Sequence, residues 1–161
     1  MLVHLQQGIS EAISEIEELM QHFPDQLRRL TSIRGISTTI ATALLEVTGG
    51  FRQFHSAKAL AKYIGVVPVV YQSGKTQLTK GICKTGDPQL RALLYVASWA
   101  AIRYNKPCQL LYQRLKAAGK ASKVALMAVV NKLLRQAFAV VTYQQDFDPD
   151  YQPISRTKPC F

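Results

Sequence analysis

Residues 27–45 read LRRLTSIRGISTTIATALL and contain two apolar stretches with helical spacing on either side of a glycine. Leu27 and Leu30 belong to the first stretch, Ile40 and Leu44 to the second, so each stretch can bury one face. Gly35 lies between them and predicts a tight turn, because glycine tolerates backbone angles that other residues avoid. The stretch therefore predicts a helical hairpin, and it opens a domain that we expect to be mainly α-helical.

The turn around Gly35 resembles a helix-hairpin-helix, in which the amides that open the second helix point at a DNA phosphate. Ser37 stands where that motif has a second glycine, and its hydroxyl can still cap the helix. Arg34 adds positive charge beside the turn. We therefore expect Arg34, Gly35 and Ser37 to contact nucleic acid, while an ordinary helical hairpin with a glycine turn is the alternative.

Residues 1–24 precede this hairpin and predict an amphipathic helix with an acidic outer face. Its apolar stripe fits either a coiled-coil arm or a surface helix folded onto its own domain. Pro24 lies where the first turn of a new helix tolerates proline, so we place the main domain at residues 25–143.

Residues after the hairpin first predict a short helix and then two strands. Ser56 and Gly65 bound the short helix as its cap and its stop. A β-branched run at residues 66–71 is extended, and residues 76–81 return as a second strand. The sequence therefore predicts a short β-hairpin in the middle of the domain.

Three more helices follow the strands. Asp87-Pro88 starts an apolar helix that runs to Tyr104 and contains Trp99, which we expect to pack in the core. The next two helices span about residues 108–118 and 122–143, and the last of them is predicted to pack on the Trp99 helix. Residues 144–161 predict a loosely ordered tail.

Positive charge dominates the middle of the chain. Fifteen Lys or Arg residues and one acid, Asp87, stand between Val47 and Gln145, and the whole chain has a net charge of +10. Cations that neutralise phosphates release condensed counterions, so this composition favours a nucleic acid as partner. The sequence shows neither an uninterrupted apolar run of about 18 residues nor a signal-peptide pattern, so we expect a cytoplasmic protein with no membrane partner. Its three cysteines form no Cys/His cluster, which argues against a zinc site.

The polar stretch Tyr71-Gln72-Ser73-Gly74-Lys75-Thr76 forms the turn of the predicted β-hairpin and displays Ser73 at its tip. A Ser-Gly pair taken alone is usually a turn and nothing more. Tyr71 lies beside the turn and is a candidate for contact with nucleic acid, because aromatic rings stack on bases.

Several blocks follow one another along the chain: residues 30–45, residues 54–68, Ser73-Gly74-Lys75, Gly81-Ile82, Lys84, Gly86, Leu90-Arg91, Ala101-Ile102-Arg103 and residues 112–120. In order and spacing they resemble the C-terminal transposase domain of the Piv-type invertases and the insertion-sequence one-ten transposases. The resemblance covers roughly residues 25–143. The chain departs from the family pattern at Ser37, Cys83, Thr85 and Asp87.

This resemblance implies a recombinase in which a serine of this domain attacks DNA. An N-terminal RuvC-like domain would supply the acidic ligands for Mg²⁺, and in many members a bridge RNA guides the choice of target and donor. Ser73 falls on the family's catalytic serine and Gly74 on the glycine after it.

Four cations near Ser73 in the sequence are candidates to hold the phosphodiester: Lys75, Lys80, Lys84 and Arg91. For any one of them, a solvated surface cation is the alternative. No convergent set of carboxylates is visible around Ser73, so we expect no metal site in this chain.

We therefore expect a truncated or split transposase chain that lacks the RuvC-like domain, binds DNA and does not cut it alone. Recombination joins two duplexes, which favours a dimer or a tetramer. The alternative is a non-enzymatic helix-hairpin-helix module that grips branched DNA or structured RNA by backbone contacts.

Overall fold

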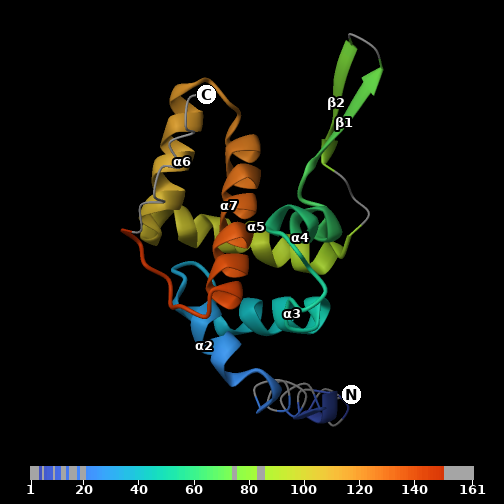
Figure 1. The fold of residues 1–161 in the computed structure, drawn as a ribbon, viewed down its shortest axis with the longest axis vertical. Coiled ribbons are helices and arrows are strands. Elements are labelled where there is room, and N and C mark those ends of the chain that lie inside the picture. The colour runs from blue at the N-terminus through green and yellow to red at the C-terminus, as the bar shows by residue number, and fades with distance from the viewer. Residues whose placement is uncertain are drawn as a thin grey trace, which may run out of the picture.

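The structure, a computed structural model, describes residues 21–73, 76–82 and 86–150 and scattered positions between residues 4 and 18, with the backbone alone described over residues 68–82. The described residues form a mainly helical body from which a two-stranded arm projects (Figure 1). The prediction of a mainly α fold is confirmed. The elements are α2 (Pro24–Ser32), α3 (Thr38–Thr48), α4 (Ala57–Ile64), β1 (Pro68–Ser73), β2 (Thr76–Ile82), α5 (Pro88–Tyr104), α6 (Lys106–Ala117) and α7 (Ser122–Thr142).

The helix boundaries follow local capping signals. Ser56 caps α4 through its side chain, and Gly65 ends that helix in the left-handed conformation with φ of 80°. Asp87 accepts a hydrogen bond from the Gln89 amide at 2.7 Å at the start of α5, where Pro88 occupies the first turn. The predicted start of this helix is therefore confirmed.

The core lies where α5 and α7 pack against each other, and α2, α4 and α6 also contact α7. The predicted packing of the last helix on the Trp99 helix is confirmed. The core is almost entirely aliphatic, and its largest fully buried side chains include Leu30, Leu44, Leu60, Leu94, Leu133 and Leu134. Each such side chain contributes about 1.5–3 kcal/mol on burial, so contacts between helices distant in sequence stabilise this body.

α7 is long and apolar enough to cross a membrane when judged by length and composition alone. Eight of its residues, from Ala125 to Val140, are nevertheless buried, and four other helices contact it. Its apolar character is thus explained by its place at the centre of the helical body.

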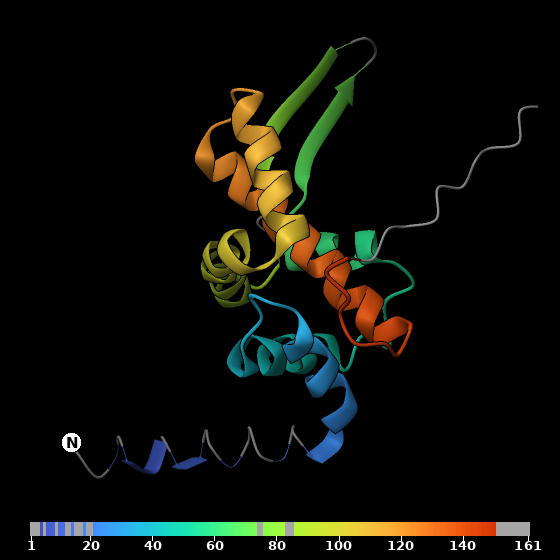
Figure 2. The ribbon, with the colours of Figure 1, turned by 90° about the vertical axis from the view of Figure 1, so that its left-hand side faces the viewer.

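β1 and β2 pair antiparallel and form the arm. Ser73 pairs with Thr76 at the far end, and the register shifts between Pro68 and Val70 near the root. The arm and the connection between α6 and α7 project in the same direction in both views of the molecule (Figure 1 and Figure 2).

Trp99 differs from its prediction, because 47% of its surface is exposed. α5 turns Leu94, Ala97 and Ala101 toward the core and leaves Val96 and Trp99 on its outer face. The expectation that Trp99 packs in the core is therefore wrong. An apolar helix does not reveal from its composition which of its faces is covered.

Residues 144–150, the described part of the predicted tail, contact α2. Arg28 Nη1 donates to Asp146 Oδ2 at 2.8 Å, and the Phe147 amide donates to Ser32 Oγ at 2.8 Å. The Phe147 side chain packs against the core. Residues 151–161 and most of the predicted N-terminal helix lie outside the described residues, so a coiled-coil arm stays a prediction.

Candidate nucleic-acid interface

The turn between α2 and α3 exposes the start of α3. Ser37 Oγ accepts a hydrogen bond from the Ile40 amide at 3.4 Å, which makes Ser37 the cap residue of α3. Arg34, Ser37 and the next two residues, Thr38 and Thr39, are exposed. The positive end of the α3 dipole thus opens to solvent beside an exposed cation, an arrangement that suits a phosphate.

Gly35 serves the packing of this turn against α5. Its φ is +108°, and a Cβ added there would lie 2.9 Å from the Cβ of Ala101 and 3.1 Å from the Ala101 amide nitrogen. A side chain would therefore clash with the helix as well as strain the backbone. The glycine sets the distance between the turn and α5.

A pair of amide side chains, from the buried Asn105 and the half-buried Gln136, holds the same turn from the other side. Asn105 is fully buried; its Nδ2 donates to the Arg34 carbonyl at 3.2 Å and to Gln136 Oε1 at 3.0 Å. Gln136 Nε2 donates back to Asn105 Oδ1 at 3.3 Å, and the Cys108 amide donates to the same oxygen. This network joins the α2–α3 turn, the start of α6 and α7, so Arg34 is held by its backbone while its side chain stays exposed.

The arm carries the second group of predicted site residues. Tyr71 and Ser73 lie in β1, and Lys80 lies in β2. Ser73 is the last residue of β1, at the end of the arm that points away from the helical body (Figure 1). Gly74, Lys75 and Lys84 lie outside the described residues.

Arg91 lies at the root of the arm. Its Nη1 donates to the Ile64 carbonyl at 3.2 Å and to the Gly86 carbonyl at 2.6 Å. Ile64 precedes β1 and Gly86 follows β2, so one guanidinium spans both connections of the arm. A Cβ at Gly86 would collide with the backbone of Tyr63 and Ile64, which shows how closely the two connections approach.

The predicted site residues that the structure describes therefore lie in three places. Arg34, Gly35 and Ser37 share the α2–α3 turn, whereas Tyr71, Ser73 and Lys80 belong to the arm. Arg91 belongs to the root of the arm and contacts backbone carbonyls there.

Metal ions in proteins are held by donor groups that lie near one another. Among the described residues, no three of His, Cys, Asp or Glu lie close enough to share an ion. These donors do not fit a Mg²⁺ site, which takes converging oxygen ligands.

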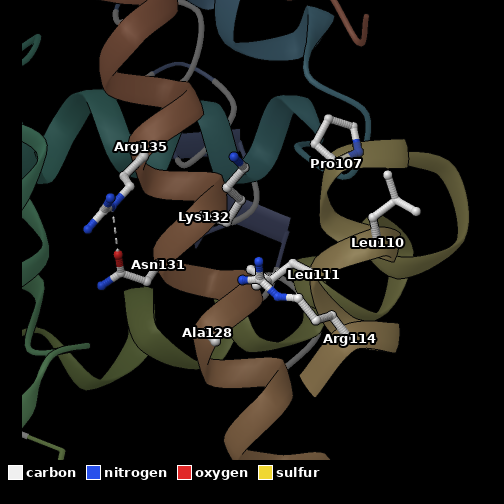
Figure 3. Close-up of a pocket in the computed structure, with 8 residues that line it drawn as sticks. All are labelled: Pro107, Leu110, Leu111, Arg114, Ala128, Asn131, Lys132 and Arg135. Atoms are coloured by element: carbon white, nitrogen blue, oxygen red, sulfur yellow. Dashed lines mark hydrogen bonds between the residues drawn. The ribbon is translucent and has the colours of Figure 1, made fainter. Parts of the chain in front are cut away.

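A basic pocket between α6 and α7 is a feature that sequence reasoning missed. It has a volume of about 400 Å³ and is lined by Pro107, Leu110, Leu111, Arg114, Ala128, Asn131, Lys132 and Arg135 (Figure 3). The two helices contribute cations from positions about twenty residues apart, so no local motif signals the site. The absence of acids throughout residues 88–142 is the only signal in the sequence.

Cys108 is buried at the start of α6, where it follows the pocket residue Pro107. Burial raises the pKa of its thiol from the ordinary value of 9.0 to about 12, and the nearby charge of Lys132 partly opposes the rise. Its Sγ lies 3.8 Å from Gln136 Oε1. A protonated, buried thiol is unsuited to nucleophilic chemistry.

Comparison with known proteins places the chain among transposases. The model of the Transposase IS116/IS110/IS902 family matches residues 27–113, more than half of the chain. A pilin gene-inverting protein of Moraxella lacunata is 30% identical over 150 residues, covering 90% of this chain and 47% of the relative. The transposase for insertion sequence element IS1111A of Coxiella burnetii is 28% identical over 143 residues, covering 85% and 39%.

A third relative, the transposase for insertion sequence element IS1328 of Yersinia enterocolitica, is 31% identical over 140 residues, covering 83% of this chain and 42% of the relative. The chain thus spans less than half the length of these curated relatives. The resemblance found from the sequence blocks is confirmed. The chain belongs to the Transposase IS116/IS110/IS902 family.

Proposed function

We propose that this chain is the DNA-binding, serine-bearing part of a transposase, and that Ser73 is its nucleophile. The observation that carries the proposal is the position of Ser73 at the far end of the arm. A residue there can reach a DNA strand that lies beyond the helical body. Family membership and the excess of cations over acids support DNA as the substrate.

We propose that the α2–α3 turn binds a DNA phosphate in the manner of a helix-hairpin-helix. Ser37 and the exposed start of α3 would face a DNA phosphate, with Arg34 beside them. Gly35 would contribute by fixing the turn against α5, and no direct contact of this glycine with DNA is required. Binding at this turn is independent of DNA sequence, because phosphate contacts fix the position of the protein on DNA and do not read the bases.

The proposed chemical step is attack by Ser73 Oγ on a DNA phosphorus. A bond forms between the serine oxygen and phosphorus, one DNA end stays joined to the protein, and the other leaves as a hydroxyl. The serine proton must be removed and the added charge neutralised. Lys75, Lys80 and Lys84 are the cations of this chain that we propose for the charge.

The remaining parts of the reaction are assigned to partners. Because the described donors do not fit Mg²⁺, we propose that a separate acidic, RuvC-like domain of the transposase holds that ion. We further propose a guide RNA that selects target and donor, a dimer or tetramer that brings two duplexes together, and a cytoplasmic location beside the DNA.

Two substitutions test this function in a strand-transfer assay reconstituted with the acidic domain. Ser73→Ala is expected to abolish strand transfer and leave DNA affinity unchanged, because the arm loses one oxygen and no charge. Lys75→Ala is expected to weaken DNA binding and lower its salt dependence by about one unit of slope. If Ser73→Ala supports full transfer, the serine role is wrong and the chain acts as a non-enzymatic binding module.

A further inference from the structure

The pocket between α6 and α7 is lined by three cations and by two leucines. Arg114, Leu110 and Leu111 come from α6, and Lys132 and Arg135 come from α7 (Figure 3). Lys132 is half-buried, whereas the two arginines are exposed. Like charges that line one pocket repel one another, and a bound anion reduces that repulsion.

Protein carboxylates do not supply that anion within the described residues. Their two salt bridges join Arg28 to Asp146 and Lys106 to Asp150, and neither involves a cation of the pocket. No acid occurs anywhere in residues 88–142, which contain α5, α6 and α7. Among the described residues, therefore, no carboxylate balances the charge of the pocket, and a bound anion would do so.

Arg135 makes one hydrogen bond within its own helix. Its Nε donates to Asn131 Oδ1 at 3.2 Å, one helical turn away on α7, and Figure 3 shows the two side chains side by side. This bond orients the guanidinium group through Nε. The two Nη groups are the donors that bind a phosphate in paired contacts.

The two leucines distinguish the pocket from a simple phosphate site. Leu110 is 57% exposed at its edge, and Leu111 is half-buried beside it. Apolar surface beside fixed cations suits a group with a charged end and a flat uncharged end. A nucleotide has this composition, with a phosphate on one side and a base on the other.

The surroundings of the pocket favour a polymer over a free nucleotide. The exposed cations Lys116, Lys120 and Lys123 continue the positive charge from the pocket to the connection between α6 and α7. That connection projects in the same direction as the arm that carries Ser73 (Figure 1 and Figure 2). A strand bound along α6 and α7 would meet a series of cations, as a phosphate backbone requires.

We propose that the α6–α7 pocket binds an unpaired nucleotide of a nucleic-acid strand, with phosphates of the strand on Arg114, Lys132 and Arg135 and the base against Leu110. The contact is separate from the α2–α3 turn and from Ser73. It extends the proposed function to a second surface, and it is tested by binding alone, so the outcome does not depend on whether Ser73 attacks DNA.

The test measures the affinity of the 161-residue chain for a fluorescent single-stranded DNA oligonucleotide over a range of salt concentrations. The pocket variant carries Arg114→Gln, Lys132→Gln and Arg135→Gln. The matched control carries Arg52→Gln, Lys58→Gln and Lys62→Gln, which removes the same charge from exposed positions next to and on α4. Circular dichroism and thermal melting check that both variants are folded.

The pocket variant is expected to lose about tenfold or more in affinity, and its salt slope should fall by about two units, since each single-strand phosphate contact contributes about 0.7. The control should lose about threefold or less. Equal losses in the two variants would overturn the proposal, because the effect would then reflect net charge. Unchanged binding in the pocket variant would overturn it as well.

Further ligands identify what occupies the pocket. Leu110→Ala should weaken binding of the normal oligonucleotide and leave binding of an abasic oligonucleotide of the same length unchanged. RNA of the same sequence distinguishes the two sources of an unpaired nucleotide, and whichever strand loses more affinity in the pocket variant is the natural one. Loss confined to fully paired duplex DNA would overturn the proposal of an unpaired nucleotide.

Discussion

Gly35 meets two demands at a single residue, a left-handed backbone angle and close contact with α5. The sequence predicted the turn, because glycine between two apolar helical stretches is a local signal. It could not predict the neighbour, since Ala101 lies far along the chain and only the packing of α3 on α5 brings them together. Local conformation is readable from sequence at this residue, and its contact is not.

Substituting Gly35→Ala should cost more stability than Gly119→Ala. Both residues have positive φ, +108° and +74°, so alanine at either position should lower the free energy of unfolding by about 1–2 kcal/mol through backbone strain. Nothing lies within 4 Å of a Cβ at Gly119, whereas at Gly35 it meets Ala101. Overpacking should add about 1–3 kcal/mol at Gly35 alone. Urea unfolding measures both free energies, and equal losses would contradict the close contact with α5.

Cys108 gives a prediction about pH. Its thiol has a pKa of about 12 in the folded chain, above the ordinary 9.0 expected after unfolding. Above pH 9 the unfolded thiol therefore loses its proton first, and the free energy of unfolding falls as pH rises. The fall attributable to this thiol is at most about 1.4 kcal/mol per pH unit.

Comparison with Cys108→Ala isolates this effect from other groups that titrate at alkaline pH. Urea unfolding of both proteins at pH values on either side of 9 should show a steeper decline for the unsubstituted chain. Parallel declines would mean that burial does not hold the Cys108 proton.

Among the helices, the starts and stops were predicted well, and so were the buried faces of α2 and α3, whereas the covered face of α5 was not. Asp87-Pro88 marks the start of α5, and Ser56 and Gly65 bound α4, because capping depends on adjacent residues. Trp99 was misplaced because α5 is apolar on more than one side and only its packing decides which side is covered. The α6–α7 pocket was missed for the same reason.

Arg91 was predicted as a phosphate ligand from its charge and its position in the sequence, and the structure shows it bound to the Ile64 and Gly86 carbonyls. We expect it to position the arm. Arg91→Gln should lower the free energy of unfolding by about 1–3 kcal/mol and speed amide hydrogen exchange in β1 and β2, because both connections lose a charged donor.

Arg103→Gln is the control for this prediction, because Arg103 is exposed on the same helix and its loss should change stability by about 0.5 kcal/mol or less. Hydrogen exchange by mass spectrometry and salt-dependent DNA binding are measured on both variants. A salt slope that falls by about one unit in Arg91→Gln, with exchange in the arm unchanged, would restore the phosphate role.

In the molecule as a whole, composition predicted a positive net charge, and the fold determines on which surfaces the cations lie. The arm and the connection between α6 and α7 project the same way from a body centred on α7 (Figure 2). The proposed reaction thus has a nucleophile at the end of one projection and the proposed strand-binding pocket along the other. The turn that carries Arg34 is a third, separate proposed contact, and hydrogen bonds of Asn105 to the Arg34 carbonyl and to Gln136 hold it.

The most direct test of the serine role is a search for a covalent bond between Ser73 and DNA. The chain, a RuvC-like domain of a family member, Mg²⁺ and a DNA substrate are incubated together, denatured and digested, and the peptides are mapped by mass spectrometry. We predict a nucleotide-bearing peptide whose modified residue is Ser73, and none from Ser73→Ala despite normal DNA binding. An adduct on another residue, or strand transfer undiminished in Ser73→Ala, would contradict the account.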